Sequence, residues 1–228
     1  MNIAIAVAHH LELNPFLEKF EEYDSYDTGR GKIYLLQIGK IPIRLVRTGI
    51  GMANAQQSLM HVLESENTPW SGSAPDVLVN FGTSGAIHPD RKIGDIVVGT
   101  HTVSDESGEA QYDLQSVWSD QLVEYLHTRN IEYAAGTIFS TEKAVTSHEG
   151  RRSIYQRTSA QVVDMECAGL AKVAQQQNLP FVSVKYVCDN ADEFAIKDFF
   201  MNTGEGVRVL TSLIYEFIEF VQTGNEPD

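Results

Sequence analysis

Short apolar segments of strand-like composition alternate with amphipathic helical segments along almost the whole chain. The strand-like segments are residues 2–8, 32–38, 41–47, 76–81, 93–98, 133–139, 161–165 and 180–187. The helical segments are residues 11–21, 53–64, 119–129, 166–177 and 204–222. Residues 103–118 lack a clear period and predict a loop, and residues 141–158 predict a loop with a short helix. The alternation predicts an α/β fold with one central, mostly parallel or mixed sheet.

The length of the chain limits the number of domains, and its net charge limits the kinds of partner that it can bind. The chain has 228 residues, of which 43% are apolar, so we expect a single domain over residues 1–228 with a sizeable core. The 31 acidic residues outnumber the 17 basic ones, and this excess disfavours nucleic acid and anionic membranes as partners. No apolar run approaches the roughly 20 residues that span a bilayer. Cys167 and Cys188 lie in apolar segments without metal-ligand spacing, so a reducing, cytoplasmic compartment is expected.

Two glycine-containing segments follow predicted strands. Gly49-Ile50-Gly51 comes after the strand 41–47, and Gly82-Thr83-Ser84-Gly85 comes after the strand 76–81. Glycine permits positive φ and a close approach of the backbone to a ligand. Ligands in open α/β sheets bind at the carboxyl ends of strands. Both segments are therefore candidates for binding a polar substrate, the alternative being ordinary tight turns.

Carboxylates also follow three predicted strands. Asp164 and Glu166 are expected on one side of their strand, with Met165 on the other. Glu166 would bind a vicinal diol, or else simply lie in the first turn of a helix. Asp189 ends an apolar strand, where partial burial raises a carboxyl pKa and suits a general acid. Glu12 would activate water as a base. The alternatives are a capping residue for Asp189 and a solvated helix residue for Glu12.

The histidines predict no metal site. His9 and His10 are adjacent, so their side chains are expected to point apart rather than share an ion. No other Cys or His spacing matches a metal site, and no metal or cofactor is expected.

Several weak motifs occur in a specific order. They are T-G-I-G-x-x-N-A (48–55), G-T-S-G-A with I-G-D-I-V-V (82–98), G-T-I-x-S (136–140), V-D-M-E-x-A (163–168) and C-D-N-A-D (188–192). In this order the chain resembles the purine nucleoside phosphorylase and uridine phosphorylase superfamily, and within it the 5′-methylthioadenosine/S-adenosylhomocysteine nucleosidases. The resemblance spans residues 2 to about 220. It implies a three-layer α/β/α fold around a mixed, partly barrel-like sheet, cleavage of an N-glycosidic bond, and a homodimer.

The resemblance also assigns catalytic roles to matching positions. Asp189 matches the general acid that protonates the purine at N7, and Glu12 matches the residue that binds the nucleophilic water. Glu166 matches the carboxylate that holds the ribose hydroxyls, and Met165 matches the methionine that packs on the sugar.

Further positions match residues around the substrate. Thr83 stands where the nucleosidases carry a serine near the water, and Lys185 stands where they carry an arginine. The segment around Val145 and the backbone near Val163 match the base site. The chain departs from the family pattern at Ala144, where an aromatic ring is usual, and at His9-His10-Leu11.

The choice between hydrolysis and phosphorolysis depends on arginines. The phosphorylases of this superfamily bind phosphate with arginines near the first strand turn and before the second glycine segment. This chain has His9 and Asn80 near those places, and the charge of Glu12 would repel phosphate. We therefore expect hydrolysis of 5′-methylthioadenosine, S-adenosylhomocysteine or both, releasing adenine and a 5-thioribose. Arg44 and Arg47 leave a phosphorylase as one alternative, and a nucleoside-binding protein without turnover is the other.

Overall fold

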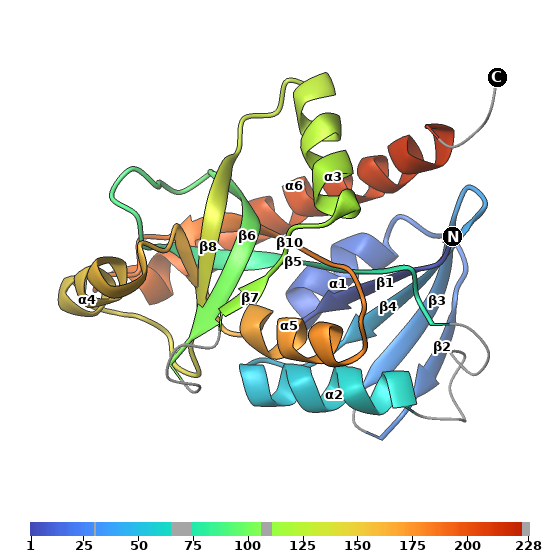
Figure 1. Cartoon of the computed structure of the whole chain (residues 1–228), viewed down its shortest axis with the longest axis horizontal. Helices are drawn as coiled ribbons and strands as arrows, with labels where there is room; N and C mark the ends of the chain where they lie inside the picture. Colours follow the sequence, from blue (N-terminus) through green and yellow to red (C-terminus); the bar gives the residue numbers. More distant parts are fainter. Residues whose placement is uncertain (30, 65–73, 106–110, 225–228) are drawn as a thin grey trace.

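A computed structural model describes residues 1–29, 31–64, 74–105 and 111–224 of the chain (Figure 1). The strands are β1 (Ile3–Val7), β2 (Asp24–Asp27), β3 (Lys32–Ile38), β4 (Ile41–Arg47), β5 (Val77–Ala86), β6 (Ile96–Ser104), β7 (Gln111–Asp113), β8 (Ala134–Ser140), β9 (Val162–Asp164) and β10 (Phe181–Asp189). The helices are α1 (His10–Leu17), α2 (Met52–Glu64), α3 (Val117–Thr128), α4 (His148–Thr158), α5 (Cys167–Gln176) and α6 (Ala195–Thr223). The predicted α/β class is confirmed.

The strands form one mixed sheet whose order is β10-β6-β8-β9-β5-β1-β4-β3-β2, with β7 paired to β6. An additional pairing of β10 with β5 closes five of these strands into a barrel, and β1 to β4 extend from it. The mixed, partly barrel-like sheet that the sequence predicts is therefore present. Strands β4, β1, β5 and β10 are parallel neighbours, so their carboxyl ends meet at one edge of the sheet.

Two helical layers cover the sheet. Helices α1, α3 and α6 pack together on one side, where Phe16, Tyr125 and Phe217 join the larger core. Helices α2 and α5 pack on the opposite side, where Leu59 and Leu170 join a second core (Figure 1). Helix α4 covers a small third cluster at the barrel end of the molecule. No helix in the described segments combines the length and hydropathy needed to cross a bilayer.

Residues 82–85 and the start of α6 differ from the sequence prediction. The residues 82–85 lie within β5 rather than in a turn after it. This segment pairs with β10 and, at Gly85, with β9, so closure of the barrel extends the strand. Helix α6 begins at Ala195, well before the predicted start at residue 204. Gly206 lies inside this helix because the ring of Tyr186 occupies the space that a side chain would need.

The predicted loop 103–118 also contains regular structure. Strand β6 continues to Ser104, β7 pairs with it, and α3 begins at Val117. Residues 106–110 lie outside the described part of the chain. The polar composition of this segment did not predict β7, because this short strand pairs with β6 outside the barrel and its side chains are largely exposed.

Candidate active site

A cavity of about 430 Å³ opens at the edge of the sheet where the parallel strands end. Its walls come from the segment after β1, the turn after β4, the end of β5, the segments after β8 and β9, the end of β10 and the start of α6. Seven of the eight predicted site residues line it: Glu12, Thr83, Val145, Val163, Met165, Glu166 and Asp189. The eighth, Lys185, lies beneath it and is 1% exposed.

Glu12 is a buried carboxylate held by backbone donors. One oxygen, Oε2, accepts hydrogen bonds from the backbone N–H groups of Ala8 (2.9 Å) and His9 (3.3 Å). The other, Oε1, accepts from the backbone N–H of Thr83 (3.1 Å). Burial raises the pKa of Glu12, while the charge of Lys185 and these three donors oppose part of the increase. The side chain is thus fixed at the cavity wall rather than solvated on its helix.

Gly82 gives Glu12 the space that it occupies. A Cβ atom built on Gly82 would lie 2.5 Å from Glu12 Oε1, closer than nonbonded atoms approach. We expect Gly82→Ala to displace the carboxylate and lower the turnover of the nucleoside about a hundredfold, since small misplacements of reacting groups cost that much.

The matched control is Gly204→Ala in α6. There the nearest atom to a new Cβ is Arg208 Nη2 at 3.6 Å, so no displacement is expected. Steady-state kinetics of both variants checks the prediction. Equal activity of the two variants would show that Gly82 does not set the position of Glu12.

Asp189 ends β10 at the opposite end of the cavity. Its Oδ1 accepts a hydrogen bond from the backbone N–H of Ala191 (2.7 Å), and the Cys188 thiol lies 3.5 Å from its Oδ2. Burial raises the pKa of Asp189, which favours the protonated form that a general acid needs. A Cβ on Gly85 would lie 2.6 Å from Asp189 Oδ1, so this glycine admits the carboxyl group.

Strand β5 sets the separation of the two carboxyl groups. Glu12 lies against Gly82 and Thr83, whereas Asp189 lies against Gly85. Three residues of a strand span about 10 Å. At this separation the carboxyl groups of Glu12 and Asp189 do not share a proton.

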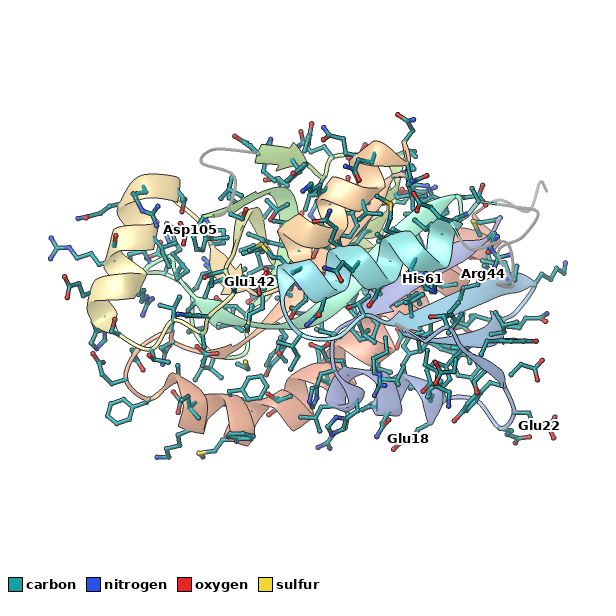
Figure 2. All side chains as sticks on the ribbon, turned by 90° about the horizontal axis from the view of Figure 1, so that it is seen from below. Glu18, Glu22, Arg44, His61, Asp105 and Glu142 are labelled. Atoms are coloured by element: carbon teal, nitrogen blue, oxygen red, sulfur yellow. The ribbon has the colours of Figure 1, made fainter. Side chains whose placement is uncertain are left out.

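Glu166 occupies the same cavity beside the turn after β4. Its Oε1 accepts from the backbone N–H of Gly51 (2.9 Å), whose φ is +95°. Burial, and then the neighbouring charge of Asp164, raise the pKa of Glu166 to about 8. Glu142 caps α2 nearby by accepting from the backbone N–H of Ala53 (3.0 Å; Figure 2). The turn 49–51 therefore positions a side chain of the cavity.

Lys185 and Asp164 form a buried ion pair beneath the cavity. Lys185 Nζ lies 2.7 Å from Asp164 Oδ2 and donates to Asn80 Oδ1 at 2.8 Å. Asp164 also accepts from the Ser140 hydroxyl (2.5 Å) and the Cys167 backbone N–H (3.0 Å). Burial alone would lower the pKa of Lys185, but Asp164 and neighbouring negative groups outweigh it and raise the pKa. The sequence analysis did not predict this network, because the side chain of Lys185 has to fold inward.

We expect Lys185→Met to lower the free energy of unfolding by about 3 kcal/mol or more, because it leaves the Asp164 carboxylate buried without its partner. The control is Lys172→Met, which removes an exposed lysine from α5. Urea unfolding of both variants measures the difference. Equal stability of the two variants would show that the ion pair contributes nothing.

Apolar side chains form much of the remaining cavity wall. Val163 packs beside Gly85, and Ala144 and Val145 come from the segment after β8. Phe199 and Phe200 also line the cavity, from the first turns of α6, and were not among the predicted site residues. The apolar residues between 195 and 200 have the same helical spacing as the buried face of α6. This pattern could have predicted that the helix begins before residue 204.

The fold and the site define an α/β protein with a closed-barrel sheet and a carboxylate-lined cavity at its strand ends. The chain belongs to the phosphorylase superfamily, whose family model matches residues 2–219.

Similar proteins and solved structures are named as nucleosidases or as a futalosine hydrolase. A 5′-methylthioadenosine/S-adenosylhomocysteine nucleosidase of Anoxybacillus flavithermus is 27% identical over 209 residues, which cover 84% of this chain and 86% of the relative. A Helicobacter pylori nucleosidase variant with 5′-methylthioadenosine in its active site has a TM-score of 0.88 at 19% identity, covering 96% of this chain and 98% of that one. A futalosine hydrolase of Helicobacter pylori has a TM-score of 0.87 at 19% identity, with coverages of 96% and 97%. These solved structures share the fold of this chain.

Proposed function

We propose that this chain is an enzyme that hydrolyses the N-glycosidic bond of a purine nucleoside. The proposed substrate is 5′-methylthioadenosine, S-adenosylhomocysteine or both, and the products are adenine and the 5-thioribose. The proposal depends on one observation: Asp189 and Glu12 lie at different points along β5 in one cavity, and Glu166 lines the same cavity. The names of the relatives in the superfamily agree with this reaction.

Each carboxyl group has one role in the proposed reaction. The protonated carboxyl of Asp189 donates its proton to N7 of the purine, which makes the base a neutral leaving group. Cleavage leaves a sugar with oxocarbenium character, and the carboxyl group of Glu166 binds its hydroxyl groups. Glu12 accepts a proton from the water that attacks C1′. One water is consumed, and the protons of Asp189 and Glu12 re-equilibrate with solvent.

The remaining predicted residues position the substrate in this proposal. Met165 packs on the sugar, and Val145 and Val163 contact the base. Thr83 lies beside the water through its backbone contact with Glu12. Lys185 lies beneath the cavity and does not contact the substrate in this proposal. Its positive charge favours the ionised forms of Glu12 and Glu166. No cofactor takes part.

Hydrolysis is favoured over phosphorolysis by the charges of the cavity. Its described lining contains no Lys or Arg, whereas Glu12, Asp164, Glu166 and Asp189 all contribute carboxyl groups. A phosphate dianion would enter this site against four acidic groups without a strong counter-charge. Water needs no such counter-charge.

We also propose a homodimer of single-domain subunits in the cytoplasm. Four large apolar side chains at the start of α6 are 63–74% exposed: Phe194, Ile196, Phe200 and Met201. An exposed apolar patch of this kind is typical of a protein–protein interface, and we propose that a second copy of the chain covers it. Ile196 and Phe200 also line the cavity, so a partner there would narrow its mouth. Two buried free thiols, Cys167 and Cys188, agree with a reducing compartment.

The proposed reaction is tested by incubating the protein with 5′-methylthioadenosine, S-adenosylhomocysteine and adenosine, and measuring free adenine by chromatography. We expect catalytic release of adenine from at least one of the two thio-nucleosides. Binding of all three without any release would instead support a nucleoside-binding protein.

A further inference from the structure

His9 and Glu142 are two ionisable side chains near the cavity that the proposed reaction does not use. The His9 ring serves its own helix, because its Nδ1 accepts a hydrogen bond from the backbone N–H of Leu11 (3.2 Å) and caps α1. This ring stacks on that of His10 with centroids 3.9 Å apart, contrary to the expectation that the two side chains point apart. Glu142, in contrast, bonds to a helix whose first turn lies 89 positions earlier in the sequence.

Glu142 caps helix α2 from outside the helix. Gly51 directly precedes α2 and has no side chain, so the free N–H groups of the first helical turn need acceptors from elsewhere. Glu142 Oε1 accepts from one of them, the backbone N–H of Ala53, at 3.0 Å. A carboxylate at this end of a helix also interacts favourably with the helix dipole. Figure 2 shows Glu142 beside the start of α2.

Gly51 contacts both Glu142 and Glu166, the residue proposed to bind the ribose hydroxyls. Its backbone N–H donates to Glu166 Oε1 at 2.9 Å. A Cβ atom built on Gly51 would lie 2.7 Å from Glu142 Oε2, and the φ of +95° also favours glycine here. The carboxylate of Glu142 therefore packs directly on the turn that holds Glu166.

The backbone of Glu142 belongs to a segment that forms part of the opposite wall. Ala144 and Val145 reach the cavity from residues 141–147, which lie between β8 and α4 and contain no helix or strand. The two ends of this segment are fixed by β9 and α4. Between these ends, the bond from Ala53 to Glu142 is the only hydrogen bond in the described part of the chain that joins the segment to another element.

We propose that Glu142 is a positioning residue that fixes the apolar wall at Val145 relative to Glu166. This inference rests on the proposed function, which places the purine against Val145 and the ribose hydroxyls at Glu166. Without the Glu142 carboxylate, the segment 141–147 has to be ordered each time a nucleoside binds, and that ordering costs binding free energy. Glu142 does not line the cavity, so it acts on affinity rather than on the chemical step.

The test measures binding of adenine and turnover of 5′-methylthioadenosine by Glu142→Ala. We expect the KM for the nucleoside and the Kd for adenine each to rise about tenfold, the lower end of what a hydrogen bond to a charged group contributes, with kcat within about threefold of the wild-type value. Glu142→Gln keeps an acceptor oxygen at the same reach and should recover most of the affinity. Glu142→Asp is one methylene shorter and should not. Glu149→Ala removes an exposed carboxylate from the first turn of α4 and should match the wild-type protein.

The affinity for adenine separates positioning from a purely structural role. If Glu142 only capped α2, Glu142→Ala would lower Tm and leave the Kd for adenine unchanged, which would overturn the inference. Weak adenine binding by Glu142→Gln would also overturn it, because the bond to Ala53 would then not be what holds the wall. If the wild-type protein neither binds adenine nor cleaves a nucleoside, the proposed function fails and this inference fails with it.

Discussion

Asp189→Asn is expected to lower kcat about a thousandfold while the nucleoside still binds. The amide keeps the shape of the carboxyl group, and its oxygen can still accept from the Ala191 backbone N–H. It has no acidic proton to give to the purine, and general acid catalysis contributes about 10²–10⁴ in rate. Single-turnover rates measure the chemical step, and calorimetric titration with adenine or an unreactive nucleoside analogue measures binding.

The control for Asp189 is Asp192→Asn, three residues further along. Asp192 accepts from the backbone N–H of Phe194 at 2.8 Å and does not line the cavity. Its amide variant should retain near-normal kcat. If Asp189→Asn turned over within tenfold of the wild-type protein, Asp189 would not be the acid.

Glu12→Gln is expected to lower kcat by a similar factor, because the amide cannot accept a proton from water. This variant also carries a structural cost. Both oxygens of Glu12 accept from backbone N–H groups, so the new NH₂ group must face one of those donors. The mismatch should reduce the free energy of unfolding by about 1–3 kcal/mol, the usual cost of an unpaired buried polar group.

Glu18→Gln is the matched control for Glu12. Glu18 follows α1 immediately and its side chain is exposed, as Figure 2 shows. It should change neither kcat nor Tm. Kinetics and thermal unfolding of both variants separate the chemical role of Glu12 from its structural role. A Glu12→Gln protein with full activity would remove Glu12 from the mechanism.

Local patterns predicted the fold class and the position of most site residues. Apolar strands and amphipathic helices are encoded in short windows, and parallel strands bring their carboxyl ends to one edge. This reasoning placed Glu12, Glu166 and Asp189 near one another before the structure was known. The resemblance to the superfamily added Val145, Val163 and Met165, which line the same cavity. The roles of all these residues remain predictions.

Features that depend on contacts far apart in the sequence could not be read from local patterns. The strand conformation of 82–85 comes from pairing with β10 and β9, which is a property of the closed barrel. The inward direction of Lys185 depends on Asp164 and Asn80, which come from two other strands. Gly82 and Gly85 leave space for the carboxyl groups of Glu12 and Asp189. This role depends on the three-dimensional positions of those two side chains, which local patterns do not give.

In the proposed reaction, a water molecule held by Glu12 attacks the sugar. The most direct test is the mass of the sugar released from 5′-methylthioadenosine in the presence of excess phosphate. Hydrolysis predicts free 5-methylthioribose, formed at the same rate with and without phosphate. A sugar 1-phosphate, or release that requires phosphate, would contradict hydrolysis and turn attention to Arg44 and Arg47 as phosphate ligands.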